Sequence, residues 1–232
     1  MKKSILLALA GAAFASSAHG FEVVGGSVAI GYSAFTEETD VNKLNFGGQL
    51  EFGLSREFSL QGDVNLSKFG LTDIDNRSIG LHGIYHLSSE TSLGAFIGTD
   101  RVEGANVDFY GIEAGHQFGQ FGLEGYLSRA DLEGVADGTV IGLKGEYAIT
   151  PAALVGVRFD NINVDGYDAS RLSLTGQYAF TEGFAVTGEL GNADIDTYGS
   201  ETFFGLGVKV SFGAKRGATF DQRSVVDLLP GL

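Results

Sequence analysis

The stretch Phe203–Phe212, FFGLGVKVSF, alternates between large apolar residues and small or polar ones. One parity carries only apolar side chains, those of Phe204, Leu206, Val208, Val210 and Phe212. After the leading Phe203, the other parity carries Gly205, Gly207, Lys209 and Ser211. A period of two places successive side chains on opposite faces of a strand, so this stretch predicts a β-strand with one apolar face.

The same alternation recurs along the chain and predicts twelve strands. They are expected near 24–36, 42–54, 57–68, 77–88, 91–100, 107–118, 121–129, 139–149, 152–161, 170–181, 184–192 and 201–213. Tight turns alternate with longer loops near 37–41, 69–76, 101–106, 130–138, 162–169 and 193–200. Strands of about ten residues with short turns at one end and longer loops at the other are typical of transmembrane barrels. The predicted fold is all-β: a transmembrane antiparallel up-and-down β-barrel of twelve strands.

A soluble barrel or a β-sandwich is the alternative fold, and ten or fourteen strands are the alternative counts. Three features favour the membrane. The second face of the strands is mostly small and neutral rather than charged, and a sheet of this size needs closure to avoid unpaired edges. Aromatic side chains stand beside the short turns, as in an interfacial girdle: Phe52, Phe58, Tyr85, Phe118, Phe121, Tyr147, Phe180, Phe184 and Phe212.

Composition and the two ends of the chain set the domain organisation. The 232 residues include 36 glycines and no cysteine, and the net charge is −14. This composition excludes a disulfide scaffold and argues against nucleic-acid binding. Residues 1–20 have a basic start, an apolar run and small residues at the end, which predict a cleaved signal peptide. The expected division is 1–20 signal peptide, 21–213 outer-membrane β-barrel and 214–232 C-terminal periplasmic tail. The tail could dangle, contact a partner or plug the barrel mouth.

These features together resemble a known family. The signal, the alternating segments and the repeats 142–147 (GLKGEY) and 205–212 (GLGVKVSF) look like a Gram-negative outer-membrane porin, closest in style to small α-proteobacterial porins. The resemblance implies an outer-membrane location and passive diffusion of ions and small polar solutes. The partners that it implies are outer-membrane lipid, lipopolysaccharide and the barrel assembly machinery, with a homo-oligomer as an option. The last strand departs from the family pattern because twenty residues follow Phe212.

The parity opposite the apolar face should line the lumen. A twelve-stranded barrel has a backbone radius of roughly 12 Å. Eleven glycines fall on the inward parity. Their small size favours either a water-filled passage through the barrel or relief of strain in the sheet. The predicted pore-lining charges are acidic in the earlier strands and mostly basic in the later ones: Glu51, Asp63, Glu113, Glu124, Lys144, Glu146, Arg158, Arg171 and Lys209. Two interpretations stay open, a transverse field between opposite walls and local ion pairs. The longer loops are rich in acidic residues, among which we count Asp100, and they predict an acidic outer rim of the barrel.

Other chemistry is weakly supported by the sequence. Asn161, Asn163 and Asp165 imitate the start of a calcium loop, but Leu172 stands where a bidentate Glu is needed. A lipid esterase would need His86 and Ser88 on the lipid face, and they lie on the lumen parity beside a short turn. We therefore expect no enzyme, no cofactor and no metal. A non-conducting structural or surface-interaction barrel remains the alternative function.

Overall fold

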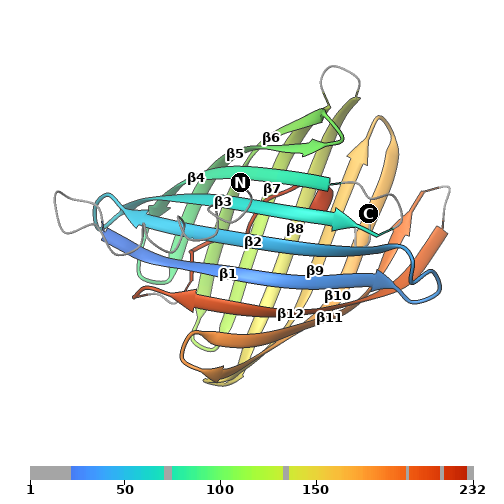
Figure 1. The fold of residues 1–232 in the computed structure, drawn as a ribbon. Coiled ribbons are helices and arrows are strands. Elements are labelled where there is room, and N and C mark those ends of the chain that lie inside the picture. Colours follow the sequence, from blue (N-terminus) through green and yellow to red (C-terminus); the bar gives the residue numbers. More distant parts are fainter. Residues whose placement is uncertain (1–21, 71–74, 133–135, 197–198, 215–216, 229–232) are drawn as a thin grey trace, which may run out of the picture.

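The computed structural model describes residues 22–70, 75–132, 136–196, 199–214 and 217–228, so the predicted signal peptide lies outside the described residues. Twelve antiparallel strands pair in chain order, and β1 pairs with β12 to close the barrel (Figure 1). The predicted fold class is therefore confirmed. The pairing of the first strand with the last runs from Gly26–Phe212 to Phe35–Phe203, so the ladder is complete before the tail begins.

The strands are 12 to 15 residues long. Their bounds are β1 (Glu22–Phe35), β2 (Asn42–Gly53), β3 (Phe58–Phe69), β4 (Asp75–His86), β5 (Thr91–Val102), β6 (Ala105–Phe118), β7 (Phe121–Leu132), β8 (Ala136–Thr150), β9 (Ala153–Val164), β10 (Tyr167–Thr181), β11 (Phe184–Ile195) and β12 (Gly199–Phe212). The described residues also contain one 3₁₀ helix, η1 (Val226–Leu228), and no helix in them is long and apolar enough to cross a bilayer.

Two of the predicted longer loops are wrong. The connections expected at 101–106 and 162–169 are two-residue turns, because β5 and β6 extend to Val102 and Ala105 and β9 and β10 extend to Val164 and Tyr167. The turn residues Glu103-Gly104 and Asp165-Gly166 all have positive φ. That is the backbone of a type I′ turn, whose twist matches the twist of paired strands. The residues that imitated a calcium loop are thus strand and hairpin.

The outer surface of the barrel is apolar. Ile97, Ile112 and Leu174 are each at least 60% exposed, as expected for side chains that face lipid. Aromatic rings pair at the short-turn end: Phe58 lies 4.9 Å from Tyr85 on the neighbouring strand, and Phe118 lies 6.4 Å from Phe121 across a short turn, centroid to centroid. The rings therefore form a girdle at the short-turn end, as the sequence predicts.

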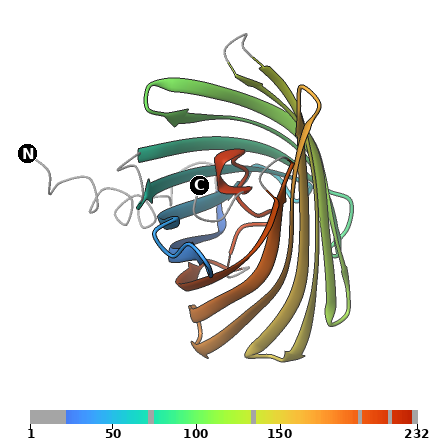
Figure 2. The ribbon, with the colours of Figure 1, turned by 90° about the vertical axis from the view of Figure 1, so that its right-hand side faces the viewer.

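The interior is polar and filled on one side by the C-terminal tail. Side chains with no exposed surface include those of Glu51, Gln61, His82 and Asp100. After β12 the chain reverses and runs back into the barrel, where it lies inside the curved sheet (Figure 2). The tail passes close to Gly25 of β1: a Cβ on Gly25 would lie 1.9 Å from the carbonyl oxygen of Gly217. This approach therefore requires glycine at position 25. The described tail is thus in the lumen, not a free periplasmic segment.

Candidate functional site

The lumen has two chemically different walls. Of the predicted pore-lining residues, Glu51, Asp63, Glu113 and Glu124 come from β2, β3, β6 and β7. Lys144, Glu146, Arg158, Arg171 and Lys209 come from β8, β9, β10 and β12. The tail lies against the first group, and a cavity lies against the second. The two groups therefore meet different surroundings inside one barrel.

The main chain of the tail is held by side chains of the acidic wall. Gln61 makes two hydrogen bonds to Phe220: its amide nitrogen donates to the carbonyl (3.0 Å) and its oxygen accepts from the backbone N–H (3.2 Å). Gln49 also donates to the Phe220 carbonyl, and the Thr219 backbone N–H donates to Glu51 (2.7 Å). These side chains satisfy the backbone groups that an adjacent strand would otherwise satisfy.

Arg223 is the charged anchor of the tail. Its guanidinium lies 2.9 Å from Glu113 and contacts Glu124, and both it and Glu113 are buried. It also lies over the ring of Tyr126, 4.2 Å from the centroid. A buried carboxylate needs such a partner, because an isolated charge inside a protein is costly.

Asp100 holds the end of the described tail. One of its carboxylate oxygens accepts hydrogen bonds from the backbone N–H groups of Val225 (2.7 Å) and Val226 (3.1 Å) and from the Ser224 hydroxyl. It therefore caps η1 from the strand against which the tail lies. The sequence assigned Asp100 to an exposed acidic rim, and this is wrong: it is fully buried on β5, because β5 continues past it to the hairpin.

His82 bridges two carboxylates beneath the tail. Its ring nitrogens lie 2.7 Å from Asp63 and 2.6 Å from Glu113, and the imidazole has no exposed surface. Because Glu113 also contacts Arg223, a continuous chain of ionisable groups runs from β3 to the tail. In the described part of the chain, no group of His, Asp and Glu side chains is arranged to hold a metal ion.

Inward glycines on this wall make room for the tail. A Cβ on Gly94 would lie 2.8 Å from the Phe220 ring, and one on Gly115 would lie 3.3 Å from it. A Cβ on Gly47 would lie 2.5 Å from the side chain of Gln222. The tail therefore occupies part of the space that these glycines leave, while Gly47 and Gly115 also line the cavities.

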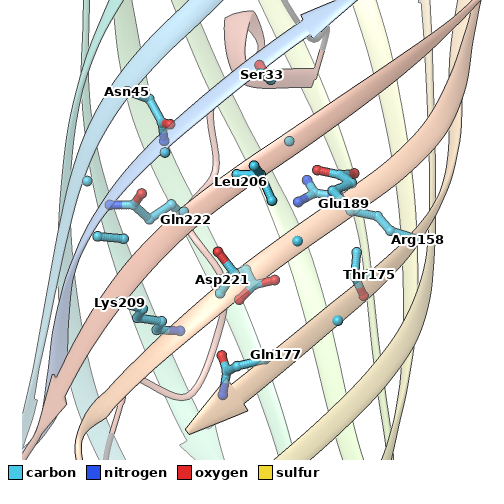
Figure 3. A pocket seen from close by; sticks show the side chains of 18 of the residues that line it. Ser33, Asn45, Arg158, Thr175, Gln177, Glu189, Leu206, Lys209, Asp221 and Gln222 are labelled. Carbon is cyan, nitrogen blue, oxygen red and sulfur yellow. The ribbon is translucent and has the colours of Figure 1, made fainter. Parts of the chain in front are cut away.

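The rest of the lumen contains a cavity of about 350 Å³. It lies between the tail and the strands β1, β2 and β7 to β12, and Figure 3 shows Asp221 of the tail among Arg158, Glu189 and Lys209. Among its described lining residues, five are cationic and three are acidic: Lys43, Lys144, Arg158, Arg171 and Lys209, against Glu146, Glu189 and Asp221. The cavity is thus rich in positive charge.

Several of these charges are paired locally. Arg158 and Arg171 each lie 2.7 Å from the same oxygen of Asp160. Lys144 lies 3.1 Å from Glu146 and 2.8 Å from Asp221 of the tail. The Lys144 ammonium lowers the pKa of Asp221 well below its usual range, so this tail carboxylate stays ionised. Local pairing and separation of the two walls therefore coexist.

A second cavity of about 830 Å³ opens at the short-turn end. It is lined by turn residues such as Glu57 and Ser89 and by Thr219 of the tail. Lys144 and Glu146 line both cavities. The two cavities therefore approach each other at this ion pair, beside Asp221.

The site residues that the sequence did not single out are mostly in the tail. Phe220, Asp221 and Arg223 carried no pattern that identified them, because their partners lie about 80 to 170 positions earlier in the chain. Gln61 is buried on the lumen side, and nothing in the sequence indicates that it binds main chain. One feature of the sequence does point to a tail that binds the barrel: basic and apolar residues follow the end of the last predicted strand.

A closed twelve-stranded barrel with an apolar outside and a charged, partly hollow inside defines the class of outer-membrane channels. A family model described as Gram-negative porin matches residues 42–198, and the chain belongs to that family. It is an outer-membrane channel for small solutes. A comparison with curated proteins finds no match.

Solved structures share the fold at low sequence identity. A KdgM porin in complex with disordered oligogalacturonate has 12% identity and a TM-score of 0.65, with 80% of this chain and 99% of that chain covered. The NanC porin has 11% identity and a TM-score of 0.61, with 80% and 98% covered. An outer-membrane channel from Pseudomonas putida F1 has 14% identity and a TM-score of 0.59, with 84% and 97% covered.

Proposed function

We propose that this porin passes small anionic solutes along the wall formed by β8 to β12, through the space that the tail leaves open. The observation that carries the proposal is the lining of the 350 Å³ cavity, in which described cations outnumber carboxylates by five to three. Cationic groups in a narrow, low-dielectric passage raise the local concentration of anions.

The proposed route passes Lys144. The cavity on the basic wall and the cavity at the short-turn end both include Lys144 and Glu146 in their linings. A solute that crosses from one to the other would pass between this pair and Asp221. Lys209 and Arg158 line the main cavity on the same wall. Five of the nine predicted pore-lining residues, those of β8 to β12, therefore lie beside the proposed route. The other four lie on the side of the tail, and one of them, Glu124, also lines the second cavity.

Passage is proposed to be passive and non-enzymatic. The His86 imidazole contacts Ser59 and Ser92 on the lumen side, away from the lipid face that a lipid esterase would need. The apolar belt supports contact with lipid and lipopolysaccharide as partners, and the β12 strand is the segment through which the assembly machinery would recognise the barrel. A homo-oligomer remains part of the proposal from the family alone.

A planar bilayer experiment tests this function. Purified full-length protein in a gradient of potassium chloride should give stepwise currents, with a reversal potential whose sign indicates chloride preference. A reversal potential of the opposite sign would overturn the anion preference. Absence of stepwise current would favour the alternative function, a non-conducting structural barrel. That alternative is tested because the tail occupies the part of the lumen beside the acidic wall.

A further inference from the structure

We infer that the C-terminal tail determines the ion selectivity of the channel, because its described residues 217–228 cover the acidic wall. The inference rests on the proposed channel function and deepens it. The described part of the tail contacts carboxylates of four strands: Glu51 of β2, Asp100 of β5, Glu113 of β6 and Glu124 of β7. With the tail seated, Glu51, Asp100 and Glu113 have 4% exposure or less. Solutes therefore meet mainly the opposite wall.

Removal of the tail would expose strand carboxylates that the tail now covers. The described carboxylates on the inward parity of the strands number nine: Glu51, Asp63, Asp100, Glu113, Glu124, Glu146, Asp160, Glu189 and Glu201. The inward-facing described cations of the strands number five: Lys43, Lys144, Arg158, Arg171 and Lys209. The seated tail leaves five cations and three carboxylates around the main cavity. A channel without the tail would have an excess of carboxylates and would favour cations.

The barrel does not need the tail to close. Every strand ladder, including the one between β1 and β12, is formed within residues 22–212. The described part of the tail adds no strand to the sheet, and its hydrogen bonds to the barrel are with inward side chains and with backbone carbonyls of β2 and β3. It can therefore be removed or displaced while the sheet stays closed.

The seat of the tail is matched to it in charge and shape. Arg223 is placed between Glu113 and Glu124, and Asp221 lies 2.8 Å from Lys144. The Phe220 ring is 2% exposed and fits where Gly94 and Gly115 have no side chain. A tail that merely filled space would not need charges of opposite sign aimed at two different walls.

The test compares three proteins by reversal potential and single-channel conductance in a potassium chloride gradient. They are the full chain, a chain that ends at Gly213, and a full-length Arg223→Glu variant. The variant sets a third carboxylate beside Glu113 and Glu124, so repulsion should displace the tail without shortening the chain. Arg101→Glu is the matched control, because Arg101 is an exposed residue on the outward parity of β5.

We expect the shortened chain and Arg223→Glu to show roughly twofold or higher conductance and a reversal potential of opposite sign to the full chain. A synthetic peptide of residues 214–232 added to the shortened channel should restore the lower conductance, whereas a scrambled peptide should not. Equal conductance and equal reversal potential in all three proteins would overturn the inference. Failure of the full chain to conduct, or cation preference of the full chain, would instead overturn the proposed function.

Discussion

Arg223, in the tail, and Glu113, on β6, form a buried salt bridge of 2.9 Å across 110 positions of sequence. Both side chains have 4% exposure or less. The same guanidinium contacts Glu124 on the adjacent strand β7 and lies over the ring of Tyr126. This one side chain therefore ties the tail to the acidic wall and places one positive charge between two of its carboxylates.

Replacing Arg223 should destabilise the folded protein. Arg223→Gln removes the positive charge and leaves Glu113 buried without its guanidinium partner, which should lower the free energy of unfolding by about 3 kcal/mol. Urea unfolding in lipid vesicles measures the change. Arg101→Gln, on the exposed outward parity of β5, should change it by less than about 0.5 kcal/mol. Equal stability of the two variants would argue that the tail is not anchored at Glu113.

A side chain at Gly115 should push the tail from its seat. A Cβ there would lie 3.3 Å from the Phe220 ring, so Gly115→Val places further methyl groups in the space of that ring. We expect higher single-channel conductance. Gly83→Val is the control, because Gly83 has nothing within 4 Å of the added Cβ and is exposed on the outer face. If both variants conduct like the parent chain, Phe220 does not occupy the lumen.

Reversing one charge on the basic wall should weaken anion preference. Lys209→Glu changes the charges around the main cavity from five cations and three carboxylates to four of each. The reversal potential in a potassium chloride gradient should move toward zero, because the excess of positive lining charge is gone. Arg101→Glu makes the same change of charge away from the lumen and should leave it nearly unchanged. An unaltered potential in Lys209→Glu would contradict the proposed route.

The stabilisation from Asp221 should persist into acid. Lys144 lowers the pKa of Asp221 in the folded protein well below the usual value of about 3.9. A lowered carboxyl pKa stabilises the fold fully above the unfolded-state pKa, and that stabilisation is lost as the pH falls toward the folded-state pKa. The difference in unfolding free energy between the parent and Asp221→Asn should therefore be constant from pH 7 to about pH 5 and shrink below about pH 4. A difference that vanishes by pH 6 would contradict the Lys144 contact.

The barrel could be predicted because its pattern is local and repeated. Alternation such as that of Phe203–Phe212 encodes which face of each strand meets lipid, and twelve copies of it predict a closed sheet. The hairpins at Glu103-Gly104 and Asp165-Gly166 were missed because their acidic residues suggested solvated loops. The structure has two-residue turns with positive φ at both positions instead.

The position of the tail could not be predicted, because its contacts are distant in sequence and partly made to main chain. Gln61 binds the backbone of Phe220, and the Asp100 carboxylate binds the backbone N–H groups of Val225 and Val226. Such contacts place no requirement on the side chains of the tail. The acidic wall was visible in the sequence, but the segment that covers it was not.

The position of Ser224 relative to Asp100 gives the most direct test of the account. The Ser224 hydroxyl lies 3.1 Å from the Asp100 carboxylate, and the chain has no cysteine of its own. In outer membranes that contain the Asp100→Cys, Ser224→Cys protein, dibromobimane should bridge the two thiols and become fluorescent. The matched pair Arg101→Cys, Ser224→Cys, with one thiol on the outward parity, should stay dark. The predicted result is fluorescence of the first pair alone. If the barrel is folded and neither pair is bridged, or both pairs are bridged, the result contradicts a tail seated in the lumen.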